Sequence, residues 1–272
     1  MTRLPKLIAT DLDHTLLNGE GHVSARTRAA LDAARAAGIT VVPVTARQPI
    51  GLVDIAREAG FEEWALCSNG AFGIHLQTRE LLFANEIPAR VVAEIVSAIH
   101  ARIPSVVFAA VRDAGDGFLA QPGYAALADF SDHKRAPAEM DLGTLAEIAS
   151  EPALKLVMRD ATLSVAEIFA AVADLDLDGC ELTLSGAPFV DVMAAGITKA
   201  AGLAELCDHL GIARDEVYAF GDELNDAEMI AWAGHGVAMG NAIGAVKAVA
   251  DEITGTNDED GLAQVVERLL AR

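Results

Sequence analysis

The chain has 272 residues, of which 52% are hydrophobic and 22% charged, a composition typical of a globular protein with one large domain or two modest ones. Its formal net charge of −20 at pH 7 argues against nucleic acid and against an anionic membrane surface as partners, because both would repel it. A phosphorylated small molecule stays open as a ligand, since a lysine or a metal ion inside a cleft can reverse the local field.

Three widely spaced cysteines, Cys67, Cys180 and Cys207, show no paired spacing and predict reduced core residues. Charged residues or prolines interrupt every apolar stretch before about 18 residues, so no membrane span is predicted. The N-terminal residues Met1 to Pro5 lead into a strand too early for a secretory signal. We therefore expect a cytoplasmic protein.

The first predicted strand is the apolar run Leu7 to Ala9, and two carboxylates, Asp11 and Asp13, follow it together with the hydroxyl of Thr15. Carboxylates are depleted in strands and costly to bury without a partner. A capped turn is one explanation, because Asp and Thr both hydrogen-bond to local backbone. A reactive site at the end of a core strand is the other.

Strands and helices alternate after this turn. Ser24 is a candidate N-cap for a helix that ends at Gly38, and a strand over 39–44, a helix over 50–59 and a strand over 64–68 follow. Such alternation predicts a parallel sheet with helices on both faces, whose ligands lie at the carboxyl ends of the strands. Four polar residues fall at such ends: Asp11, Asp13, Thr45 and Asn69.

The regular alternation of predicted strands and helices stops at residue 71. The predicted elements are a hairpin over 72–77 and 80–84, a helix over 88–102, strands over 106–111 and 118–121, a weakly patterned region over 124–147, a strand over 154–158, a helix over 165–173 and a strand over 181–185. This block predicts an inserted α+β cap domain at 85–188. Residues 1–84 and 189–272 are then the core, a Rossmann-like doubly wound parallel α/β sheet.

The strand-helix pattern returns from residue 190. Thr198 can cap a helix that runs to Leu210, and a strand over 217–220 ends in Gly221 and Asp222. A helix over 225–233, a strand over 236–239 and a helix opened by Asn241 come next. The acids at 258–260 precede the last helix, where they suit the positive end of its dipole.

The run Asp11-Leu12-Asp13-His14-Thr15-Leu16 resembles the D-x-D-x-T-L signature of the haloacid dehalogenase (HAD) phosphatase superfamily. Thr45, Lys199 and the run from Gly221 to Asp226 follow in the order of that superfamily's other motifs. The long insertion between Thr45 and Lys199 is similar to the Cof-type branch, whose members are mostly small-molecule phosphatases. The resemblance covers essentially the whole chain.

The resemblance implies a hydrolase that removes phosphate from a small phosphorylated metabolite, a sugar phosphate or similar, through an aspartyl-phosphate intermediate. Asp11 would be the nucleophile. Asp13 would protonate the leaving group and then activate water as a base. Thr45, Lys199 and Asn225 would bind the phosphate. Lys199 also lies at a predicted helix start, where a cation opposes the dipole unless an anion is near.

Phosphate beside several carboxylates requires a cation, and oxygen ligands in an incomplete protein cage suit Mg²⁺. The resemblance implies Asp11, Asp222 and the backbone carbonyl of Asp13 as the ligands, with Asp226 one turn after Asp222 in support. Helix capping is the alternative reading of Asp222 and Asp226. The chain departs from the family's usual glycine at His14 and at Ala46, and Ala46 and Asn69 are expected to face the cleft.

Two other functions share many of these residues. A phospho-acceptor signalling module also places an acidic cluster, a Thr and a Lys on a parallel sheet, but it needs neither a leaving-group acid nor an inserted domain. A phosphomutase or phosphotransferase of the same superfamily would carry the same motifs, whereas a dehalogenase lacks the second aspartate and the metal. The expected partner is a small phosphorylated metabolite, and the protein is expected to be a monomer or a homodimer.

Overall fold

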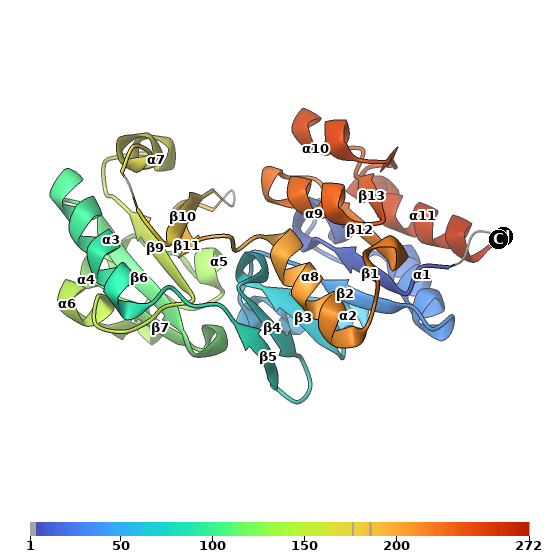
Figure 1. Cartoon of the computed structure of the whole chain (residues 1–272), viewed down its shortest axis with the longest axis horizontal. Helices are drawn as coiled ribbons and strands as arrows, with labels where there is room; N and C mark the ends of the chain where they lie inside the picture. The colour runs from blue at the N-terminus through green and yellow to red at the C-terminus, as the bar shows by residue number, and fades with distance from the viewer. Residues whose placement is uncertain (1–3, 176, 185–186, 272) are drawn as a thin grey trace. The chain divides into compact units, whose positions relative to one another are not determined.

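The computed structural model describes residues 4–175, 177–184 and 187–271 (Figure 1). The chain divides into two compact units. The first consists of Met1–Ala46, Leu52–Leu82 and Thr198–Arg272, and the second of Arg47–Gly51 and Phe83–Ile197. No helix in the described part of the chain is both long enough and apolar enough to cross a membrane.

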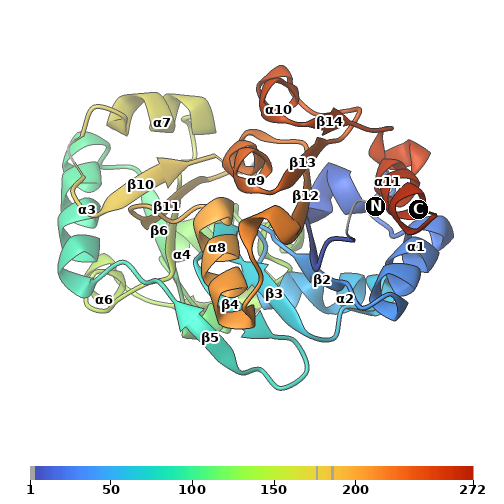
Figure 2. The same ribbon diagram turned by 45° about the vertical axis from the view of Figure 1, so that its right-hand side comes forward.

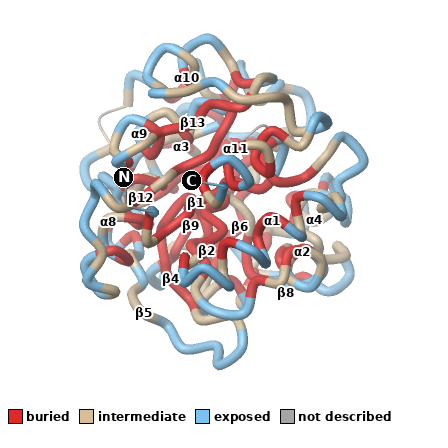
Figure 3. The backbone as a smooth tube through the Cα atoms, turned by 90° about the vertical axis from the view of Figure 1, so that its right-hand side faces the viewer, coloured by how far each residue is buried: buried red, intermediate tan, exposed pale blue. Residues whose placement is uncertain are grey.

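The first unit is built on a five-stranded parallel sheet in the order β14-β13-β12-β1-β2. Its strands are β1 (Leu7–Thr10), β2 (Thr40–Pro43), β12 (Val217–Gly221), β13 (His235–Ala238) and β14 (Glu252–Ile253). Buried backbone runs through the middle strands of this sheet (Figure 3), and all four residues of β1 are buried. The uninterrupted apolar run in β1 is what a parallel strand covered on both faces requires.

The order of the strands reverses between β1 and β12. The chain moves outward from β1 to β2 and then returns to pair β12 with the other side of β1. The result is the predicted doubly wound sheet, and it places the ends of β1 and β12 at the point where ligands bind in such folds. Asp11 follows β1 directly, and Asp222 follows β12.

Helices flank this sheet, and several begin and end as the sequence predicts. The Ser24 hydroxyl accepts the backbone N–H of Thr27 at the start of α1, and that of Thr198 accepts the N–H of Ala201 at the start of α8. Gly211 ends α8 with a positive φ of 65°, which glycine adopts without steric cost. The helices are α1 (Ala25–Ala36), α2 (Val53–Ala59), α8 (Lys199–Leu210), α9 (Ala227–Trp232), α10 (Gly244–Val249) and α11 (Gly261–Leu270).

A small antiparallel sheet follows β2 in the chain. Strand β3 (Trp64–Cys67) joins the end of β2 through a parallel bridge between Val44 and Leu66. It pairs with β4 (Phe72–His75) in a three-stranded sheet whose outer strand is β5 (Leu81–Ala84). The predicted hairpin is confirmed, and Arg79 takes a positive φ in its turn.

The second unit has a six-stranded sheet in the order β10-β11-β9-β6-β7-β8, antiparallel except between β7 and β8. An apolar cluster joins one face of the sheet to α3 and α7, which lie side by side in Figure 2. The elements are α3 (Ala89–Arg102), β6 (Val107–Arg112), β7 (Gly117–Ala120), α4 (Pro122–Leu127), α5 (Phe130–His133), β8 (Asp141–Leu142), α6 (Leu145–Ile148), β9 (Lys155–Arg159), α7 (Val165–Val172), β10 (Cys180–Thr183) and β11 (Val190–Ala194).

The structure corrects the predicted return to the core at residue 189. Strand β11 lies beyond that boundary but pairs antiparallel with β9 and β10, so it belongs to the sheet of the second unit. Its apolar residues Val190 and Val192 are buried in that unit's core, which the sequence pattern could not distinguish from a core strand of the first unit. Ser185, the predicted end of the strand before it, lies outside the described residues. Helix α10 begins at Gly244, so Asn241 does not open it.

The other face of the second sheet carries a buried histidine. His133 bonds through Nε2 to the hydroxyl of Tyr124 at 2.7 Å and stacks on Phe189, with 4.7 Å between ring centroids. Burial, together with the charges of Lys155, Arg159 and Arg135, lowers the pKa of His133 to about 3. The folded protein therefore holds this imidazole neutral at pH values where a free histidine is charged.

This histidine is expected to weaken the protein in acid. Because its pKa is depressed in the folded state, its contribution is fully present above the unfolded pKa of about 6.5 and is lost as pH falls toward 3. Between pH 7 and pH 5 the wild type should lose about 2 kcal/mol more unfolding free energy than His133→Gln. Urea unfolding of both proteins at the two pH values measures the difference. Equal losses in the two proteins would contradict the burial of a neutral His133.

Candidate active site

The turn after β1 brings three groups to the end of the strand in different directions. Asp11 is buried, Asp13 is exposed, and Thr15 is buried again. The change of direction occurs at His14, which has φ 58° and ψ 9°. A side chain in this left-handed conformation costs about 1 kcal/mol relative to glycine, which lacks the Cβ that causes the strain.

Lys199 links the residue that follows β1, Asp11, to Asp226 in the segment after β12. Its Nζ donates to Oδ1 of Asp11 and to Oδ1 of Asp226, each at 2.6 Å, and its side chain is 1% exposed. Thr15 donates its hydroxyl to Oδ1 of Asp222 at 2.7 Å. Lys199 therefore has two anions beside it at the helix start, and both are aspartates; its expected contact with phosphate stays a prediction.

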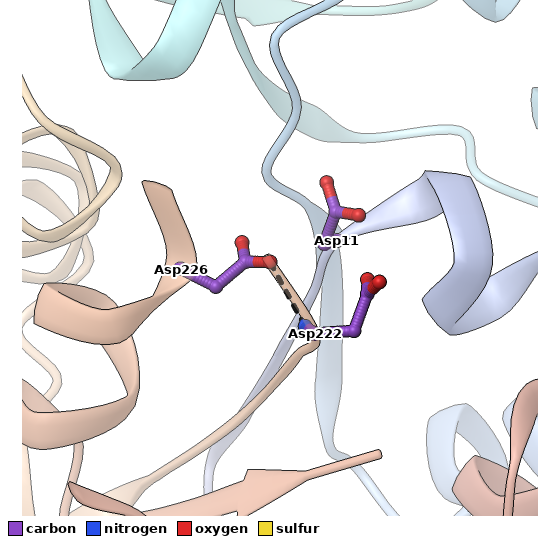
Figure 4. A group of neighbouring side chains, drawn as sticks. All are labelled: Asp11, Asp222 and Asp226. Atoms are coloured by element: carbon purple, nitrogen blue, oxygen red, sulfur yellow. Dashed lines mark hydrogen bonds between the residues drawn. The ribbon is translucent and has the colours of Figure 1, made fainter. Parts of the chain in front are cut away.

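Asp226 fixes the backbone that presents Asp222. Its Oδ2 accepts the backbone N–H of Asp222 at 2.9 Å and that of Glu223 at 3.0 Å, while Oδ1 accepts Lys199. Figure 4 shows the carboxylate of Asp226 turned toward the backbone nitrogen of Asp222. Gly221 leaves the room for this contact, because a Cβ there would lie 2.4 Å from the Cβ of Asp226. Asp226 therefore both caps the backbone after β12 and pairs with the ammonium of Lys199.

Burial shifts the pKa values of Asp11, Asp222 and Lys199. Burial raises the pKa of Asp222 to about 6, against the bond from Thr15, which lowers it. Burial also raises the pKa of Asp11, and the ammonium of Lys199 opposes that rise. For Lys199 burial acts to lower the pKa, but the two aspartates outweigh it and hold the pKa above its usual value. A further cation beside these carboxylates would favour their ionised forms.

The carboxylates fit a divalent metal ion. Oxygens of Asp11, Asp222 and Asp226 all lie within 4.8 Å of one another, and the three side chains are buried (Figure 4). Three buried carboxylates beside the single ammonium of Lys199 leave an excess of negative charge, and an all-oxygen donor set suits Mg²⁺. Because both oxygens of Asp226 already accept hydrogen bonds, Asp11 and Asp222 are the better placed side-chain ligands.

A second chain of contacts links the phosphate-binding candidates. The carbonyl of Thr45 accepts the backbone N–H of Asn69 at 2.9 Å, and the side chain of Asn69 accepts Nδ2 of Asn225 at 3.0 Å. Asn69 takes a positive φ of 57°, a conformation that asparagine tolerates better than most residues. Thr45 and Asn69 are buried, whereas Ala46 is half-buried and offers no polar side-chain atom.

Two asparagines distant in the sequence contact the turn after β1. Asn241 donates to the carbonyl of His14, and Asn257 donates to the carbonyl of Leu17, each at 2.8 Å. These partners lie 227 and 240 residues apart in the chain. The sequence does not indicate either contact, because contacts over such separations leave no local pattern.

The chain belongs to the haloacid dehalogenase-like hydrolase family, whose model matches residues 8–266. The fold and the matched family define it as a phosphoric monoester hydrolase that acts on phosphorylated small molecules. Its branch is the Cof-type phosphatases of HAD subclass IIB, as its relatives and structural neighbours indicate.

Its relatives include phosphatases with different substrates. The chain is 31% identical to the 5-amino-6-(5-phospho-D-ribitylamino)uracil phosphatase YcsE of Bacillus subtilis, over 96% of this chain and 94% of that protein. It is 28% identical to the pyridoxal phosphate phosphatase YbhA of Escherichia coli, over 96% of this chain and 97% of that protein. The solved structure of the subclass IIB sugar phosphatase BT4131 matches with a TM-score of 0.79 and 25% identity, over 97% of this chain and 98% of that one.

Proposed function

We propose that the protein hydrolyses the phosphate ester of a small metabolite in two steps, with Asp11 as the nucleophile, and that it depends on Mg²⁺. The observation that supports this most is the contact of Lys199 with both Asp11 and Asp226 at the carboxyl ends of β1 and β12. A buried carboxylate held by an ammonium is oriented for attack on one face of a phosphorus atom. The proposal rests on this geometry together with the family membership.

Asp11 attacks phosphorus through a carboxylate oxygen, and the bond from phosphorus to the leaving oxygen breaks. Asp13, exposed at the same turn, gives a proton to that oxygen. In the second step Asp13 takes a proton from a water molecule, which attacks the aspartyl-phosphate and frees Asp11. Lys199 stays beside Asp11 throughout and limits the build-up of negative charge.

Mg²⁺, held by Asp11, Asp222 and the backbone of Asp13, would neutralise phosphate oxygens beside the carboxylates. Thr45 and Asn225, linked through Asn69, are proposed to contact the phosphate. The inserted unit is proposed to select the leaving group, since relatives of nearly equal similarity act on different phosphorylated metabolites. The buried thiols of all three cysteines support the proposal that the protein works in a reducing compartment.

Removal of the metal should stop the reaction. Activity on an aryl phosphate should fall at least about a hundredfold after dialysis against a chelator, because the excess carboxylate charge then repels the phosphate. Added Mg²⁺ should restore it, and excess Ca²⁺ should inhibit because its coordination is looser. Release of inorganic phosphate measures all three effects and also separates hydrolysis from transfer to a second acceptor. Full activity in the chelator would contradict the metal assignment.

The natural substrate class can be tested with the same assay. A panel of phosphorylated metabolites, including sugar phosphates, pyridoxal phosphate and phosphorylated ribityl compounds, should give one group with a kcat/KM well above that for the aryl phosphate. Release of inorganic phosphate with no phosphorylated product would favour the phosphatase over a phosphomutase. A panel in which only intramolecular phosphate transfer occurs would overturn the proposed hydrolysis.

A further inference from the structure

The turn that carries Asp13 needs support from outside itself, because His14 holds it in a left-handed conformation. Within the turn, the N–H of Leu17 donates to the carbonyl of Leu12 at 2.9 Å, and Thr15 bonds to Asp222. The buried side chains of Leu12 and Leu16 add packing. None of these contacts holds the peptide that joins His14 to Thr15.

That peptide is held by Asn241, which is joined to a second asparagine, Asn257. Asn241 donates from Nδ2 to the carbonyl of His14 at 2.8 Å and accepts the backbone N–H of Asn257 with Oδ1 at 3.0 Å. Asn257 donates from its own Nδ2 to the carbonyl of Leu17 at 2.8 Å. The two asparagines therefore bind the turn at two points and are joined to each other.

The loop that carries Asn241 also holds the other side of the site. The N–H of Ile243 donates to the carbonyl of Asp222 at 3.0 Å, and the N–H of Met239 donates to that of Gly221 at 3.1 Å. One short loop after β13 thus fixes the backbone of Asp222 and the backbone next to Asp13. Movement of this loop would change the position of both carboxylates together.

We propose that Asn241 is a positioning residue for Asp13. It keeps the His14 peptide in the left-handed conformation and so sets the direction in which the Asp13 carboxylate leaves the turn. An amide side chain suits this position, because it offers a donor for the His14 carbonyl and an acceptor for the N–H of Asn257. The inference deepens the proposed function, since it rests on the acid–base role of Asp13.

Asn241→Ala should lower kcat on an aryl phosphate about tenfold or more while KM changes less than about threefold, because Asp13 is displaced but the phosphate contacts remain. Asn257→Ala should also lower kcat, but by less than Asn241→Ala does. Asp258→Ala is the matched control: it removes a bond to the N–H of Gly19 from the same C-terminal segment, away from Asp13. Its kcat should equal that of the wild type.

A second background separates positioning from general damage. In His14→Gly the left-handed conformation carries no steric cost, so the turn needs less support. Asn241→Ala should then cost less than about threefold in kcat when it is added to His14→Gly. An equal loss in both backgrounds, or a wild-type kcat for Asn241→Ala, would overturn the proposal.

The proposal can also be tested without turnover. Amide hydrogen exchange at residues 14–17 of the metal-free protein should be faster in Asn241→Ala than in the wild type, whereas Asp258→Ala should leave it unchanged. Unchanged exchange in Asn241→Ala would overturn the positioning role even if the enzyme were active. If the wild type hydrolyses no phosphate ester while exchange is still faster in Asn241→Ala than in the wild type, the proposed function fails and the positioning role of Asn241 stands.

Discussion

Asp11→Asn is expected to lower kcat by about four orders of magnitude or more, because the amide cannot form the aspartyl-phosphate (an acyl phosphate) through which both steps pass. The variant should remain folded, since the amide keeps the shape of the side chain and an acceptor oxygen for Lys199. Stopped assays with purified enzyme and thermal unfolding measure the two properties.

Asp54→Asn is the matched control for this loss. Asp54 lies on α2, its side chain is 83% exposed, and its bond to Arg57 is a surface ion pair of little energetic weight. Its variant should keep wild-type kcat and stability. Retention of even a tenth of wild-type kcat in Asp11→Asn would remove Asp11 from the mechanism.

Lys199→Met should damage both activity and stability. It leaves Asp11 and Asp226 buried without their shared ammonium, so the unfolding free energy of the metal-free protein should fall by about 3 kcal/mol. Activity should fall about a thousandfold, because the pKa of Asp11 rises further and less of the nucleophile is ionised at neutral pH. Lys6→Met, which removes a half-exposed lysine paired with Glu216, is the control.

The double variant Lys199→Met with Asp226→Asn distinguishes the two effects. Removal of a buried carboxylate should restore part of the lost stability, since one uncompensated charge disappears. Activity should stay low, because the backbone of Asp222 loses part of its charged acceptor and Asp11 still lacks the ammonium. A variant Lys199→Met with kcat/KM within tenfold of the wild type would contradict the role of the buried cation.

Much of the site could be predicted because its residues lie at the ends of sheet strands. Asp11 and Asp222 are adjacent in space because parallel strands present their carboxyl ends at one edge, and a strand pattern alone indicates where those ends lie. The helix start at Lys199 predicts an anion beside it, but the sequence pattern points to phosphate and does not identify Asp11 and Asp226 as its partners. These inferences depend on local patterns that a single sequence carries.

Other features depend on contacts that no local pattern encodes. The apolar run of β11 fits either sheet, and only its pairing with β9 and β10 assigns it to the second unit. The bond from Asn241 to His14 joins residues 227 positions apart. The resemblance marks His14 as a departure from the usual glycine, but the left-handed backbone of His14, and therefore its need for support, depends on the folded chain.

The most direct test of the mechanism is the lifetime of the covalent intermediate in Asp13→Asn. An aryl phosphate has a good leaving group, so Asp11 should still become phosphorylated, but the water that hydrolyses the intermediate has lost its base. Acid quench and intact mass measurement should show a species about 80 Da heavier in the variant and little of it in the wild type. Normal turnover without accumulation in Asp13→Asn, or a wild type that stays phosphorylated for minutes like a signalling module, would contradict the two-step phosphatase mechanism.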